Sequence, residues 1–135
     1  DLFVYAFIGS VATANGDTLA SEIGESSSSK PRMITTLKET EPGVDGGVTL
    51  LGEGASLLGA LIISILAAIS GMTGLLGIVI GTAAGFLGTN FDSLLGATLQ
   101  SRGTLSNNGV NLAATAFGAI AGGVVWYVLH IWNIL

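Results

Sequence analysis

The stretch TGLLGIVIGTAAGFLGTNFDSLLGATLQ, Thr73–Gln100, indicates the fold of this chain most clearly. It is apolar and long enough for a membrane-spanning helix, which needs roughly 20 largely apolar residues. Glycines and one acid recur in it every three or four positions, at Gly77, Gly81, Gly85, Gly88, Asp92 and Gly96. This spacing places them on one face of a helix. Because small residues let helices approach closely in lipid, the stretch predicts a spanning helix whose packing face carries Asp92.

Three further apolar runs predict an all-α membrane protein with four transmembrane helices. The expected helices cover residues 2–23, 48–70, 73–100 and 109–133, in a single transmembrane domain over residues 1–135. The first run reaches span length only by continuing through polar residues such as Asn15, Asp17 and Glu22. The composition agrees, since 10% of the residues are charged, against about 25% in a soluble domain.

The remaining composition excludes several classes of protein. The chain has no Cys, which excludes disulfides and thiolate-bound metals. Its net charge of −5 argues against binding to nucleic acid. The first run lacks the basic start and cleavage site of a signal peptide. Because the sequence begins at Asp1 within apolar residues, we expect part of a longer domain, completed by a further N-terminal segment or by a homo-oligomer.

The basic residues predict an orientation in the membrane. Lys30, Arg32, Lys38 and Arg102 all fall in two expected loops, residues 24–47 and 101–108, which four spans would place on the same side. The positive-inside rule makes this side cytoplasmic, with a long cytoplasmic loop between the first two helices. The aromatic residues of the last helix would then form a belt at the outer interface, namely Trp126, Tyr127, His130 and Trp132.

Candidate functional residues gather at the same ends of the helices. Asp17, Glu22 and Asp92 supply carboxylates without Cys, a ligand set for a hard cation such as Mg²⁺, which is commonly held by one or two carboxylates plus phosphates. Three cations, Lys30, Arg32 and Lys38, could neutralise phosphate charge. The turn Asp45-Gly46-Gly47 precedes the second helix, where backbone N–H groups favour an anion.

Simpler readings remain open for these residues. Asp92 could be a solvated residue at a helix end, and the basic run could be an ordinary loop at the lipid surface. Asn107 and Asn108 could only cap the fourth helix. The sequence has neither a Gly-x-Ser-x-Gly nucleophile nor a Walker A motif, so a nucleotide-using enzyme built on it would not be a P-loop protein.

Five ordered motifs carry a resemblance to a known family. They are ATANGDTLASEIG (12–24), KPRMITT (30–36), PGVDGGVTLLG (42–52), FDSLLGATLQ (91–100) and NNGVN (107–111). Together they resemble the membrane family of plant phytyl-phosphate kinase and animal transmembrane protein 19, long catalogued as a domain of unknown function. The chain looks like the C-terminal part of a member, because the family usually has further helices before the first motif.

The resemblance implies a membrane kinase that transfers a phosphoryl group from a nucleoside triphosphate, CTP in the plant enzyme, to a prenyl monophosphate lipid. Asp17 and Asp92, with Glu22, would hold Mg²⁺, and Lys30 would act in catalysis. The prenyl tail would lie along the glycine faces. The remaining expected contacts to nucleotide or substrate are Asn15, Ser21, Arg32, Thr35, Lys38, Asp45, Gly46, Gly47 and, for the acceptor phosphate or the ribose, Asn107, Asn108 and Asn111.

The alternatives are an ion-coupled membrane transporter and a non-catalytic membrane subunit. A transporter site typically has polar residues and helix breaks near the middle of the membrane. Here the polar residues gather at one end of the expected helices, which favours an enzyme at the membrane surface.

Overall fold

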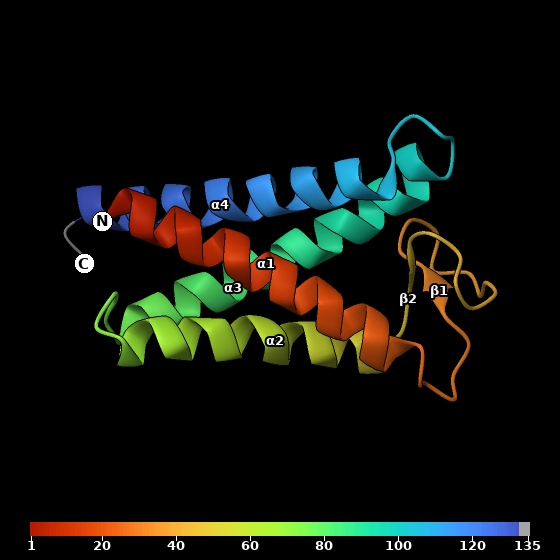
Figure 1. Ribbon diagram of the computed structural model, residues 1–135, viewed down its shortest axis with the longest axis horizontal. Helices are drawn as coiled ribbons and strands as arrows, with labels where there is room; N and C mark the ends of the chain where they lie inside the picture. The colour runs from red at the N-terminus through yellow and green to blue at the C-terminus, as the bar shows by residue number, and fades with distance from the viewer. Residues whose placement is uncertain (133–135) are drawn as a thin grey trace.

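The computed structural model describes residues 1–132, which form a bundle of long helices with a small two-stranded sheet at one end (Figure 1). The helices are α1 (Leu2–Gly24), α2 (Leu50–Ile69), α3 (Leu75–Leu95) and α4 (Asn107–Ile131), and a π-helical turn, η1 (Gly96–Gln100), continues α3. The strands are β1 (Arg32–Met33) and β2 (Gly47–Val48).

The capping residues set where the apolar runs become helices. Thr49 caps α2, its side chain accepting a hydrogen bond from the Gly52 nitrogen at 3.0 Å, so α2 begins two residues after the expected start. Ser106 caps α4 in the same way through the Gly109 nitrogen at 3.2 Å, so α4 begins two residues earlier than expected. The expected end of that helix, residue 133, lies outside the described residues.

Three helices are long and apolar enough to cross a membrane: α2, α3 together with η1, and α4. In the described part of the chain α1 does not join them, so the expectation of four spans is supported for three. α1 has the length of a span, with 23 residues. Its second half, however, carries polar residues such as Asn15, Asp17 and Ser21, which lower its apolar character.

α1 lies at the centre of the bundle and crosses it diagonally (Figure 1). Its first half packs on α4, where a Cβ on Gly122 would meet the backbone of Tyr5. Its second half packs on α2, where a Cβ on Gly59 would lie 3.1 Å from the Asn15 carbonyl oxygen. α1 therefore contacts each of the other three helices.

The glycine face of α3 packs against α1, as its spacing predicted. A Cβ on Gly85 would lie 2.6 Å from the Ala12 Cβ and 2.8 Å from the Ala60 Cβ. A Cβ on Gly88 would overlap the Thr13 side chain. Since neighbouring helices fill this face, the expectation that a prenyl tail lies along it is wrong.

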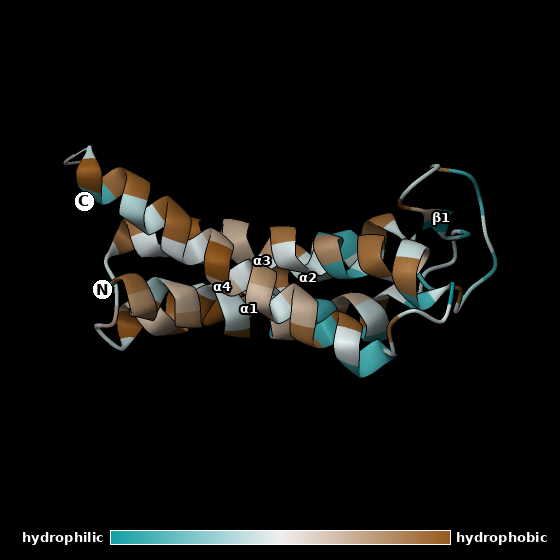
Figure 2. Ribbon diagram, turned by 90° about the horizontal axis from the view of Figure 1, so that it is seen from above, coloured by the Kyte–Doolittle hydropathy of each residue, from teal (hydrophilic) through white to brown (hydrophobic). Residues whose placement is uncertain are grey.

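The outer surface of the helices is apolar and the polar residues gather at one end. Figure 2 shows hydrophobic residues along the outside of the bundle and hydrophilic ones toward the end that carries β1. Large side chains stand exposed on each apolar helix, including Leu66 on α2, Val79 on α3 and Ile120 on α4. Such an extended apolar surface is typical of contact with lipid or with other helices.

The connection between α1 and α2 contains the two strands, which the all-α prediction missed. They pair antiparallel, with Arg32 opposite Val48 and Met33 opposite Gly47. Each has two residues, too short to leave an alternating pattern in the sequence. This connection and the one between α3 and α4 lie at the same end of the bundle, opposite the N-terminus and the α2–α3 turn (Figure 1).

Candidate functional site

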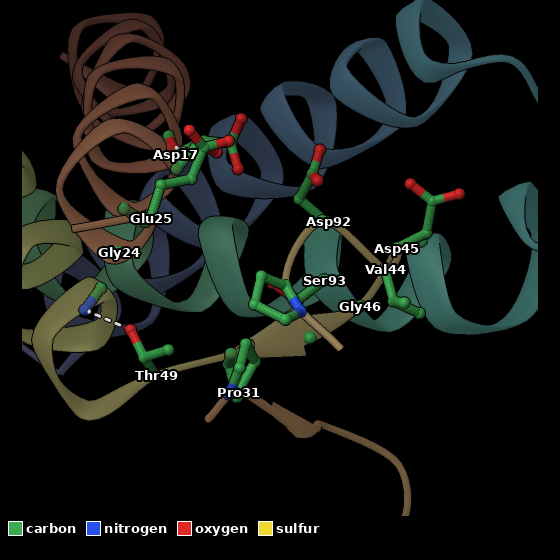
Figure 3. A pocket seen from close by; sticks show the side chains of 18 of the residues that line it. Asp17, Gly24, Glu25, Pro31, Val44, Asp45, Gly46, Thr49, Asp92 and Ser93 are labelled. Carbon is green, nitrogen blue, oxygen red and sulfur yellow. Dashed lines mark hydrogen bonds between the residues drawn. The ribbon is translucent and has the colours of Figure 1, made fainter. Parts of the chain in front are cut away.

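A pocket of about 430 Å³ opens at the polar end of the bundle. Volumes of roughly 300–1,000 Å³ are usual for small-molecule sites. It lies between the C-terminal ends of α1 and α3, the first turns of α2 and α4, and the loop before β2 (Figure 3). Segments far apart in the sequence therefore build one polar site.

Asp17 of α1 and Asp92 of α3 both line this pocket. Both side chains are partly buried and line the same pocket, so their charges would repel each other when both carboxyl groups are ionised. In the view of Figure 3, the Asp92 side chain is drawn between those of Asp17 and Asp45. With its amide nitrogen turned inward, Asn111 of α4 donates to Asp92 Oδ2 at 3.1 Å. Among residues 1–132 the one ion pair is Arg32–Glu39, so neither aspartate has a Lys or Arg partner there.

Two helix N-termini border the pocket. Thr49 and Gly52 of α2 line it, and so does Asn107 of α4. The first N–H groups of a helix lack partners within the helix, and the helix dipole makes this end favourable for anions. The pocket thus combines a carboxylate pair with two positions suited to an anion.

The loop before β2 closes one side of the pocket by packing on η1. The Gln100 side chain donates to Asp45 Oδ1 at 2.9 Å. Gly46 has a positive φ of 81°, and a Cβ there would lie 2.6 Å from the Ala97 nitrogen, so this turn requires glycine. The pocket lining includes Asp45, Gly46 and Gly47, the turn that the sequence predicts to lie beside an anion.

The structure does not bring the predicted cations into the pocket. Arg32 pairs with Glu39 at 3.4 Å and donates to the Leu37 carbonyl at 3.0 Å. Lys30, Thr35 and Lys38 are exposed and do not line the pocket. The β1–β2 pairing folds residues 32–48 back on themselves and leaves these side chains in solvent, which the sequence alone did not indicate.

Other predicted residues divide between packing and the pocket. Asn15 donates to the Gly59 carbonyl oxygen at 2.9 Å, a contact between α1 and α2, and does not line the pocket. Asn108 is exposed outside the lining. Ser21 and Glu22 do line it, although the Ser21 hydroxyl donates to the Asp17 carbonyl oxygen of its own helix at 3.0 Å.

The three carboxylates predicted to bind a metal do not form one cluster. Within residues 1–132 no three His, Cys, Asp or Glu side chains come together as ligands for an ion. Glu22 is exposed on the last turns of α1. The structure therefore brings together Asp17 and Asp92, and leaves Glu22 at the rim.

The prediction also omitted a pocket residue, Glu53 of α2. It lines the pocket, and the Asn90 side chain of α3 donates to its Oε2 at 3.1 Å. Glu53 is the only charged residue in the apolar run of residues 48–69. That isolation was the available signal, since a charge in such a run usually faces a bundle interior or water.

The chain belongs to the integral membrane protein family DUF92, whose sequence profile matches residues 1–119. This membership confirms the predicted class, an integral membrane protein. The helices, the shared polar end and the carboxylate pair are thus features of a membrane protein of this family.

Relatives come from archaea, cyanobacteria and plants. The chain is 42% identical to the uncharacterized membrane protein MJ0933 of Methanocaldococcus jannaschii over 124 residues, which cover 91% of the chain and 51% of that protein. It is 36% identical to the uncharacterized membrane protein sll0875 of Synechocystis, covering 84% and 44%. It is 38% identical to Protein PGR of Arabidopsis thaliana, covering 73% and 38%. The chain thus spans about half or less of these relatives, and no solved structure matches it.

Proposed function

We propose that the pocket is the active site of a membrane kinase that transfers a phosphoryl group from a nucleoside triphosphate, CTP by resemblance, to a prenyl monophosphate. The observation that carries the proposal is the Asp17–Asp92 pair. The two carboxyl groups line one pocket in partly buried positions, and no basic side chain pairs with either of them in the described residues. A bound cation would offset their repulsion.

The charge of the pocket supports a metal-bound nucleotide. Its lining includes no Lys or Arg and the following acidic residues: Asp17, Glu22, Glu25, Asp45, Glu53 and Asp92. A free triphosphate would be repelled here, whereas its magnesium complex carries less negative charge. The donors present, two carboxylates and no thiolate, are those that suit Mg²⁺.

Each part of the pocket has a role in this proposal. Asp17 and Asp92 would hold the cation, which would neutralise phosphate charge, and Asn111 would orient Asp92. The start of α4, where Asn107 lines the pocket, would hold a phosphate through its N–H groups. An oxygen of the acceptor monophosphate attacks the γ-phosphorus, and the bond to the β-phosphate oxygen breaks to release the nucleoside diphosphate. The acceptor is already an oxyanion, so the site needs no strong base.

We also infer the placement of the chain in the membrane. α1 packs along its length against the apolar helices, so it would cross the membrane with them as a fourth span. Lys30, Lys38 and Arg102 are exposed at the end that carries the pocket, and the positive-inside rule makes this end cytoplasmic. The prenyl tail would stay on the lipid-facing surface of the bundle. Because the relatives are longer, further segments or a second copy would complete the enzyme.

The test replaces each central aspartate by its neutral isostere in the full-length protein. Asp17→Asn and Asp92→Asn should each lower CTP-dependent phosphorylation of phytyl or geranylgeranyl phosphate by at least roughly 100-fold, as expected for loss of a group that stabilises transferring charge. Glu41→Gln, at an exposed acid outside the pocket lining, is the matched control and should retain activity. Full turnover in both variants would exclude the proposed metal role. Nucleotide-independent ion flux into liposomes, lost in the same variants, would favour a transporter.

A further inference from the structure

Glu53 occupies a part of the pocket separate from the carboxylate pair. It lies in the first turn of α2 and is partly buried at the boundary with α3. It lines the same pocket as Asp17 and Asp92 but does not join them in a three-ligand cluster. A role in holding the same cation is therefore disfavoured.

The Glu53 side chain is held in place from α3. Asn90 donates one amide hydrogen to Glu53 Oε2 at 3.1 Å and the other to the Phe86 carbonyl oxygen of its own helix at 3.0 Å. Both hydrogens of this amide are thus engaged, which fixes its orientation. Glu53 Oε1 has no hydrogen-bond partner within residues 1–132, so this pocket-lining side chain keeps one oxygen free to accept a hydrogen bond.

The chemistry of this oxygen limits what it can bind. An ionised carboxylate only accepts hydrogen bonds, and it repels phosphate, so it suits a neutral donor on the ligand. With the terminal phosphates at Asp17 and Asp92, the nearest such donors along a nucleotide are the ribose hydroxyls. In dinucleotide-binding Rossmann folds, a carboxylate accepts a hydrogen bond from a ribose hydroxyl in this way.

We propose that Glu53, positioned by Asn90, is the specificity residue that accepts a hydrogen bond from a ribose hydroxyl of the nucleotide. The proposal rests on the function proposed above, and it assigns the α2–α3 side of the pocket to the nucleoside. Of the two roles open to the asparagines, it leaves Asn107 with the acceptor phosphate, while Asn111 keeps its contact with Asp92.

The experiment compares equilibrium binding of Mg·CTP with that of Mg·2′-deoxy-CTP and Mg·3′-deoxy-CTP to the purified full-length protein. The wild type should bind at least one deoxynucleotide about 10-fold more weakly, equivalent to about 1.4 kcal/mol. Glu53→Ala should bring the ratio of the affinities for CTP and the deoxynucleotide close to one, chiefly by weakening the binding of CTP. Glu53→Gln, which keeps the shape and the contact with Asn90, should reduce the ratio in the same direction. Asn90→Leu should reduce it partly, because Glu53 is then unrestrained.

Glu41→Ala is the control, since Glu41 is an exposed acid outside the pocket lining, and its ratio should match the wild type. Equal affinity of the wild type for all three nucleotides, or an unchanged ratio in both Glu53 variants, would overturn the inference while leaving the kinase proposal intact. A loss of magnesium dependence in Glu53→Gln would also overturn it, by making Glu53 a metal ligand. Failure of the wild type to bind any of the nucleotides would instead count against the proposed function.

Discussion

Ser56 and Ser64 are two fully buried hydroxyls on α2 with different hydrogen bonding. Ser64 donates to the Ala60 carbonyl oxygen at 2.8 Å, whereas the Ser56 hydroxyl has no partner in the described residues. Burying a hydroxyl without a partner costs free energy that a satisfied hydroxyl avoids. The two serines therefore form a matched pair on one helix.

We expect Ser56→Ala to leave the free energy of unfolding unchanged or to raise it by up to about 1 kcal/mol, and Ser64→Ala to lower it by a similar amount. Thermal unfolding in detergent micelles, followed by circular dichroism, measures both variants. A clear loss of stability in Ser56→Ala would mean that its hydroxyl has a partner in the folded protein, such as a bound water.

Individual site residues were predictable where one helix decides their position. The periodic glycine face of residues 77–96 placed Asp92 toward the bundle, and the acidic end of the first run placed Asp17 at the same end. Arg32 was misplaced, because its partner Glu39 is set by the fold of the connection and not by a helical pattern. Glu53 was missed as a site residue, since its position depends on Asn90 of another helix.

The helix elements pack through glycines whose surroundings differ in a testable way. Gly85 on α3 faces α1 and α2, and an added Cβ would lie 2.6 Å from the Ala12 Cβ. Gly54 on α2 is exposed, and an added Cβ would meet nothing within 4 Å. Substitutions at the two positions therefore test two effects separately. Gly85 tests the close packing that glycine allows, and Gly54 tests the entropic cost of glycine within a helix.

Gly85→Ala should destabilise the protein by about 1–3 kcal/mol, because it overfills a packed interface. Gly54→Ala should stabilise it by roughly 0.5–1 kcal/mol, because alanine loses less conformational entropy in a helix. Chemical or thermal unfolding of the two variants in the same detergent checks the opposite signs. A stabilising Gly85→Ala would contradict the close packing of α3 on α1.

The turn before β2 offers a second matched pair. Gly46 and Gly43 both have positive φ, 81° and 83°, but only Gly46 packs on η1. The strain of an added Cβ in this backbone region is therefore common to both, and the overlap with Ala97 affects Gly46 alone. Gly46→Ala should increase hydrogen exchange in residues 42–49 and in η1 more than Gly43→Ala does. Equal effects would mean that the loop does not depend on its contact with η1.

Across the whole molecule, the helices were largely predictable and the connection between α1 and α2 was not. Apolar runs of span length give helices almost regardless of context, because lipid leaves the backbone few alternatives. The β1–β2 pairing involves two residues a strand and is set by contacts between residues distant in the sequence. The pocket depends on this connection, so its lining could not be assembled from the runs alone.

Because residues 1–135 contain no Cys, single cysteines introduced among them can report the proposed orientation. Ser28→Cys in the first connection and Thr104→Cys in the second should react with a membrane-impermeant maleimide from the cytoplasmic side. Ser70→Cys, in the turn between α2 and α3, should react only from the other side. All three positions are exposed. Labelling of Ser28→Cys and Ser70→Cys from the same side would contradict the proposed topology.

The central course of α1 has a consequence for synthesis on the ribosome. α1 emerges before α2, α3 and α4, yet it has the weakest hydrophobic signal of the four and contacts all three of the others. An insertion machinery that selects segments by their apolarity should integrate α2, α3 and α4 efficiently. It should integrate α1 inefficiently in the absence of the other helices. Stable insertion of α1 should therefore wait for its later partners, so that truncation after α2 leaves more of α1 outside the bilayer than truncation after α4.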